Sequence, residues 1–223
     1  AESAGADGVN GETYRKLILS ILAAAVLGFI AIMLFPFSPG QEGPPKLPWD
    51  VSVDDQGRVR VFGLTLGQSK LADIQALFGE EGEINLFSPA RGQFSVESYF
   101  EQIYLSSLRA DFVVTLDAPP ETLAAMYEHG LRVSQLPSGS KRVKLDPEDV
   151  ARLRQAPIRD ITYLPQPRLD EPLLEKRFGP PAERITEAES GVVHWIYPDK
   201  GLDLARDPKG KVVIQYVNPA ELP

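Results

Sequence analysis

LILSILAAAVLGFIAIMLFPF, residues Leu17–Phe37, is an uncharged run in a chain of which 24% of the residues are charged. An α-helix rises about 1.5 Å per residue, so this run would be about 30 Å long, which matches the hydrocarbon core of a bilayer. It therefore predicts a single transmembrane helix. Residues 1–16, which are small and polar, then form a tail, and the rest of the chain forms a body on one side of the membrane.

Two other interpretations of this run are a cleaved signal peptide and a buried core helix. A signal peptide has an apolar core of about 7–15 residues followed by a cleavage site made of small residues. Here Ala23, Ala24 and Ala25 come too early, because the uncharged and almost entirely apolar stretch Val26–Phe35 follows them. The pattern favours an uncleaved anchor over both alternatives.

Charges beside the run indicate its orientation. Arg15 and Lys16 precede it directly, whereas Lys46 is the first basic residue after it. Positive charge is enriched on the cytoplasmic side of membrane helices, so we expect a single-pass protein of the inner membrane with residues 1–16 in the cytoplasm and the body in the periplasm. One face of the helix carries small residues that would allow close packing against another helix: Ala23, Ala24, Ala25 and Gly28.

The composition excludes several classes of function. The chain of 223 residues has 23 Lys and Arg against 31 Asp and Glu, and its pI is about 4.9. This charge has the wrong sign for general binding to nucleic acid. The chain has no cysteine, so disulfides, thiolate metal sites and thiol nucleophiles are excluded.

The sequence after the apolar run predicts an α+β fold made of two repeated units, each a helix followed by an antiparallel meander. A proline-rich linker, 38–48, precedes a first unit at 49–130, which opens with a hairpin turn at Asp54–Gly57. A connecting hairpin and a helix that Asp146 can cap follow at 131–164, and a second unit at 165–223. The repeat is suggested by Phe78-Gly79 and Phe178-Gly179, which end two helices that Ser69 and Asp170 can cap. At the same offset of 100 residues, Val113 matches Val213. Chance similarity between two unrelated halves is the alternative.

The second unit also contains a set of short motifs. These are Arg177-Phe178-Gly179-Pro180-Pro181, His194-Trp195-Ile196-Tyr197, Gly201-Leu202 and the turn Asp207–Val212. In this order they resemble the SmpA/OmlA (BamE-like) family over residues 168–217. The resemblance implies a small scaffold or assembly module of the bacterial envelope without catalysis. Because the chain has no cysteine to lipidate, the family's usual outer-membrane location is not implied.

Catalytic motifs are absent from the sequence. It has no Gly-x-Ser-x-Gly elbow, no His-Glu-x-x-His helix and no dinucleotide fingerprint. His129 is expected at the end of a helix, and His194 as a half-buried residue of a strand. Glu80, Glu81 and Glu83 follow a helix-ending glycine and indicate a solvated turn rather than a catalytic carboxylate pair. We expect no catalytic residue, cofactor or metal site.

Positive charge is concentrated between residues 132 and 159. This stretch has seven basic residues against three acidic ones, a net charge of +4 in a chain with a net charge of −8. It is either an ordinary solvated surface or a surface that binds lipid headgroups, a cell-wall polymer or an acidic partner. The candidate residues are Arg132, Lys141, Arg142, Lys144, Arg152, Arg154 and Arg159.

Three functions follow from these observations. The first is a non-catalytic interaction or scaffold module of the envelope, bound to other envelope or inner-membrane proteins. The second is an envelope hydrolase with catalytic residues scattered along the sequence. The third is an accessory subunit of a larger inner-membrane complex, held by its anchor helix.

Overall fold

The computed structural model describes residues 44–89 and 93–222. The predicted tail and membrane helix lie outside these residues, and so do Ala23, Ala24, Ala25, Gly28 and most of the linker. Within the described ranges, no helix is long and apolar enough to cross a membrane. Lys46–Pro223 form one compact unit, so Lys46–Pro48 of the expected linker belong to the folded body.

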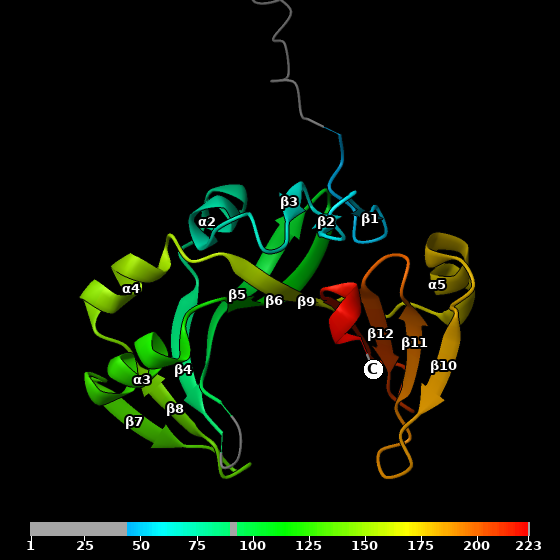
Figure 1. Ribbon diagram of the computed structural model, residues 1–223. Coiled ribbons are helices and arrows are strands. Elements are labelled where there is room, and N and C mark those ends of the chain that lie inside the picture. The colour runs from blue at the N-terminus through cyan, green and yellow to red at the C-terminus, as the bar shows by residue number, and fades with distance from the viewer. Residues whose placement is uncertain (1–43, 90–92, 223) are drawn as a thin grey trace, which may run out of the picture. The chain divides into compact units, whose positions relative to one another are not determined.

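Ten strands of the body form one antiparallel sheet (Figure 1). The strands are, in spatial order, β10 (Glu183–Thr186), β11 (Val193–Tyr197), β12 (Leu202–Arg206), β13 (Val212–Tyr216), β9 (Ile158–Pro165), β6 (Leu108–Leu116), β5 (Ser95–Leu105), β4 (Glu83–Ser88), β8 (Lys141–Lys144) and β7 (Arg132–Gln135). A separate small sheet contains β1 (Ser52–Val53), β2 (Val59–Val61) and β3 (Leu64–Thr65). The α+β class predicted from the sequence is confirmed.

Helices lie between these strands or after the last one, and local sequence sets their ends. They are α2 (Leu71–Phe78), α3 (Pro120–Glu128), α4 (Pro147–Leu153), α5 (Glu171–Phe178) and the 3₁₀ turn η1 (Pro219–Glu221). Asp146 and Asp170 cap α4 and α5 as expected, each accepting a hydrogen bond from a backbone N–H of the first turn. The expected cap of α2 is wrong, because Lys70 holds that position and the Ser69 hydroxyl accepts from the Thr65 N–H instead.

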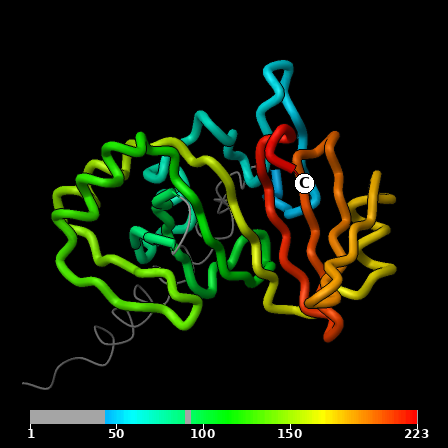
Figure 2. The backbone as a smooth tube through the Cα atoms, turned by 60° about the horizontal axis from the view of Figure 1, so that its bottom comes forward, coloured from blue at the N-terminus to red at the C-terminus, as the bar shows by residue number. Residues whose placement is uncertain are grey.

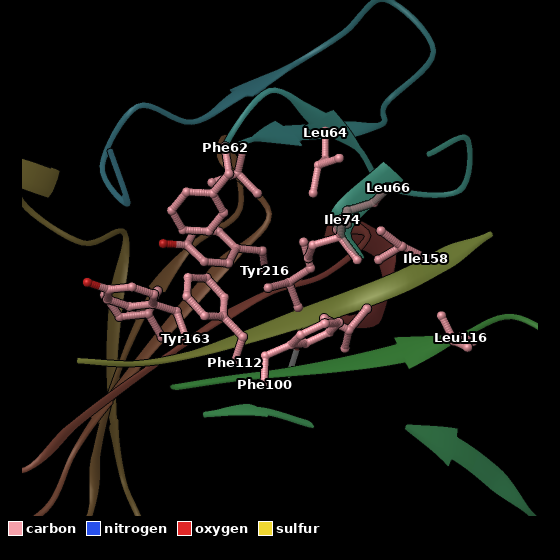
Figure 3. Packing of buried hydrophobic residues seen from close by; sticks show 14 of the residues in the cluster. Phe62, Leu64, Leu66, Ile74, Phe100, Phe112, Leu116, Ile158, Tyr163 and Tyr216 are labelled. Carbon is pink, nitrogen blue, oxygen red and sulfur yellow. The ribbon is translucent and has the colours of Figure 1, made fainter. Parts of the chain in front are cut away.

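One hydrophobic core joins the whole body. Phe62 packs against three other aromatic residues, with its ring centroid 5.5 Å from Phe112, 5.8 Å from Tyr163 and 5.5 Å from Tyr216 (Figure 3). Each of the described helices α2, α3, α4 and α5 contributes buried side chains to the same cluster. The two expected units therefore share one core and one sheet.

The sheet is continuous because β9 pairs on both sides. Thr162 lies opposite Val113 of β6 and opposite Gln215 of β13. Figure 2 shows the chain returning along yellow-green β9 beside red β13. The segment between β6 and β9 leaves the centre of the sheet. It contains α3, β7, β8 and α4, and it adds β8 and β7 to one end of the sheet.

The expected repeat does not extend through the two halves. Helices α2 and α5 are equivalent at an offset of 100 residues, and so are the starts of β4 and β10. After them, three strands lead from β4 to β6, but four lead from β10 to β13. Neighbouring strands alternate in direction, so β6 runs parallel to β4 whereas β13 runs antiparallel to β10. The repeat that matched Val113 with Val213 is wrong for this reason.

Candidate functional site

Four of the seven predicted basic residues have partners. Ion pairs join Arg152 to Asp149 (3.1 Å) and Glu148 (3.6 Å), Arg154 to Glu81 (3.2 Å), and Arg159 to Asp160 (3.1 Å). Lys141 Nζ donates a long hydrogen bond of 3.4 Å to the Tyr127 hydroxyl. The three ion-paired arginines have little positive charge left for an external anion.

The other three basic residues, Arg132, Arg142 and Lys144, line one cavity of about 500 Å³, which we name the basic cavity. Within the described ranges none of the three forms an ion pair. The remaining lining residues are Gly82, Glu83, Ile84, Asn85, Ser134, Leu145 and Val150. The predicted basic surface thus contains three arginines that form ion pairs and, in the basic cavity, three cations that do not.

Strand register brings the three cations together. Arg132 lies opposite Lys144, which lies opposite Asn85 on its other side. Ser134 and Arg142 form the next such pair. Because residues two apart on a strand point to the same face, all five side chains lie on one face of the sheet's end.

The hairpin turn between β7 and β8 fixes this register. Leu136 N–H donates to the Ser140 carbonyl at 2.8 Å, and Gly139 N–H donates to the Leu136 carbonyl at 2.9 Å. Gly139 has a φ of +81°, which glycine adopts without steric cost. A shift of one residue would move Arg142 and Lys144 to the other face of the sheet.

The described lining of the basic cavity is net positive and partly apolar. Among the described lining residues, three are basic and Glu83 alone is acidic. Glu83 accepts a hydrogen bond from Asn85 Nδ2 at 3.0 Å. Arginine presents planar pairs of N–H groups that match a carboxylate or phosphate. Ile84 and Val150 add apolar surface beside them. The site can therefore bind an anionic group together with an apolar one.

A polar row extends from the basic cavity across the sheet. Asn85 lies opposite Glu97, Glu97 opposite Thr115, and Thr115 opposite Asp160. Buried Asp160 accepts a hydrogen bond of 2.7 Å from the Thr115 hydroxyl. Burial raises the pKa of Glu97 above its usual range, and the neighbouring Asp160 carboxylate raises it further, whereas a hydrogen bond from Ser95 lowers it. Sequence reasoning missed this row because it depends on the order of the strands.

His194 is half-buried, as expected, but it also has two partners that the sequence did not reveal. Its Nδ1 lies 2.8 Å from Asp203 Oδ2, and its Nε2 lies 3.1 Å from Glu187 Oε1. Burial alone would lower the pKa of His194, but the hydrogen bonds to the two carboxylates outweigh it, so the pKa is raised. The imidazole joins the loop after β10 to β12. In the part of the chain that the structure describes, no group of three His, Asp or Glu residues could hold a metal ion.

The remaining candidates lie apart from one another. His129 ends α3, as predicted. Glu80 is exposed, Glu81 pairs with Arg154, and Glu83 faces the basic cavity. The structure does not bring these three carboxylates into one site.

Comparison with protein-family models gives no match, and a search of curated proteins finds no similar sequence. Among solved structures, the chain is similar to the crystal structure of YjgB, a DUF4309 family protein from Bacillus subtilis subsp. subtilis str. 168. The TM-score is 0.37 and the sequence identity is 12%, over 73% of this chain and 88% of that chain.

The expected resemblance to the SmpA/OmlA (BamE-like) family is wrong. No family model matches the chain, so no model of that family does. The motifs that suggested it, including Arg177–Pro181 and Asp207–Val212, form a helix end and a turn between strands. Glycine and proline favour such turns through local backbone geometry, which unrelated meanders share.

Proposed function

We propose that the chain is a membrane-anchored, non-catalytic interaction module of the bacterial cell envelope. Its body lies on the periplasmic side and binds an acidic partner protein in the basic cavity. The observation that carries this proposal is the convergence of Arg132, Arg142 and Lys144 on one cavity, while three neighbouring arginines are neutralised by their own partners.

Charge supports an acidic partner at this site. The chain has a net charge of −8, so most of its surface repels an acidic protein. The basic cavity is a local exception, and such an exception orients an approaching acidic partner and increases its rate of association.

The lining favours a protein partner over a lipid headgroup or a cell-wall polymer. Ile84, Leu145 and Val150 line the basic cavity beside the cations. A bare phosphate or a sugar gains little from apolar side chains. A protein segment with both acidic and apolar side chains uses the whole lining.

The test compares two charge-reversed variants of the full chain, purified in mild detergent after cross-linking in cells. The first variant carries Arg132→Glu, Arg142→Glu and Lys144→Glu. The control carries Lys176→Glu, Lys209→Glu and Lys211→Glu, which changes the net charge equally at exposed lysines outside the basic cavity. Copurified proteins and anionic lipids are quantified for each variant.

We expect the cavity variant to lose its copurified protein by at least about tenfold, since loss of three interfacial cations costs a few kcal/mol. The control variant should keep it, and moderate salt should weaken the wild-type association. Equal recovery with both variants would refute the proposal. Loss of bound anionic lipid alone would assign the site to a membrane surface. If the copurified protein were lost only from a variant that carries Ala24→Leu and Gly28→Leu, the chain would instead be an accessory subunit held by its anchor helix.

A further inference from the structure

The sheet ends at two edge strands, β10 and β7, which differ in their surroundings. On β10, Arg184 pairs with Glu171 (3.0 Å) and Glu175 (2.7 Å) of α5, which lies beside that edge (Figure 1). β7 also has a single strand partner, β8, but within the described ranges no residue of β7 forms an ion pair with a helix. Its outer edge presents backbone groups that another strand can pair with.

Backbone hydrogen bonds at the turn between β7 and β8 show which backbone groups of β7 point outward. Leu136 N–H bonds to Ser140, so this pair is of the hydrogen-bonded type. Such pairs alternate with non-hydrogen-bonded pairs along an antiparallel ladder. The Ser134–Arg142 pair is therefore hydrogen-bonded, whereas the N–H and C=O groups of Val133 point away from β8.

Exposed apolar side chains also gather at this edge. Leu131 is 57% exposed and Val133 is 49% exposed. They are two of four large hydrophobic residues that are exposed in the described part of the chain, and both lie at β7. The other face of the same strand carries Arg132 and Ser134, which line the basic cavity. The edge is therefore apolar on one face and basic on the other.

We infer that the acidic partner binds by adding an extended segment to β7 as an eleventh strand. In this segment apolar residues alternate with Asp or Glu. The apolar side chains pack on Leu131 and Val133, and the acidic ones face Arg132 on the basic-cavity side. This inference rests on the proposed function and specifies how the partner is held.

The spacing of strands suits this arrangement. Neighbouring strands lie about 4.8 Å apart, so an acidic residue of the added strand is one spacing from Arg132 and two from Lys144, within reach of their long side chains. A second copy of this chain is a poorer occupant. Pairing two β7 edges would bring two sets of three unpaired cations together, and like charges across strands repel.

The experiment measures binding of the peptide acetyl-(Val-Glu)₄-amide to the full chain in detergent. The control peptide is acetyl-(Val-Lys)₄-amide. Amide hydrogen exchange is followed at Val133 and Gln135, and affinity is measured for Val133→Pro and Val133→Ala. Proline removes the outward N–H at a position where an edge strand tolerates it, whereas alanine keeps the N–H and shortens the side chain.

We expect the Glu peptide, but not the Lys peptide, to slow exchange at Val133 and Gln135. Val133→Pro should bind at least about tenfold more weakly than Val133→Ala. Equal affinity of these two variants, or unchanged exchange at both amides of the wild type, would overturn strand addition. If the cavity charge-reversed variant then bound the Glu peptide as tightly as the wild type, the proposed function would fail as well. A change from monomer to dimer without peptide would instead assign the edge to a second copy.

Discussion

The hydrogen bond from Tyr216 to Pro48 gives a sharp test of the single core. The Tyr216 hydroxyl donates to the Pro48 carbonyl at 2.7 Å, across 168 residues of sequence. Tyr216 has no exposed surface, and burial raises the pKa of its hydroxyl well above the usual value. The group therefore remains a protonated donor in the folded body, and it ties the first residues of the body to the last strand.

Tyr216→Phe should destabilise the body by about 2 kcal/mol. The ring and its contact with Phe62 remain, so the loss comes from the hydrogen bond and from leaving the buried Pro48 carbonyl without its donor, which costs about 1–3 kcal/mol. For a domain of 150–250 residues, about 2 kcal/mol lowers the Tm by roughly 4–8 °C.

The assay is thermal and urea unfolding of the full chain in detergent, followed by circular dichroism. Tyr163→Phe is the matched control, because Tyr163 is buried in the same cluster and its hydroxyl makes no hydrogen bond to any described residue. Its Tm should change by less than about 2 °C, as is usual when no partner is left unsatisfied. Equal stability of the two variants would refute the role assigned to the Tyr216 hydroxyl.

Two further predictions concern local contacts. His194→Gln should destabilise the body by about 1–2 kcal/mol near pH 6, because the charged imidazole loses its bond to Asp203. Because the pKa of His194 is raised in the folded protein, its contribution to stability is fully present below the ordinary pKa of 6.5. It is lost as pH rises through the raised pKa of the folded state. A difference in urea unfolding between the variant and the wild type that does not change with pH would contradict this prediction. Gly82→Ala should cost about 2–4 kcal/mol from strain and overpacking. Its φ is +71° and an added Cβ would lie 2.5–2.8 Å from two side chains of β5. Gly57→Ala, with φ +76° and open space, should cost about 1 kcal/mol, and similar losses in both variants would count against the packing at Gly82.

Local sequence predicted the elements of the body well. Asp146 and Asp170 cap helices, Gly79 ends α2 with a φ of +70°, and the turn at Asp54–Gly57 joins β1 to β2. These features depend on neighbours along the chain, which a single sequence displays. The pairing of β9 with both β6 and β13 depends on contacts far apart in sequence, and no local pattern indicates it.

The candidate site was predicted only in part for the same reason. The concentration of basic residues between positions 132 and 159 was visible in the sequence, but the shared face of Arg132, Arg142 and Lys144 follows only from the strand register. Which cations stay unpaired depends on tertiary contacts such as Arg154 with Glu81, 73 residues away. Asn85 joins the site only because β4 pairs with β8. Similarly, Asp203, one of the two carboxylates that contact His194, comes from the neighbouring strand β12.

The most direct test of the central claim is amide hydrogen exchange of the full chain, measured with and without its copurified partner. We expect slower exchange in the complex at β7 and β8, which carry the cations of the basic cavity, and unchanged exchange at β10 and α5. Unchanged exchange at β7 and β8, with protection elsewhere on the body, would contradict binding at the basic cavity.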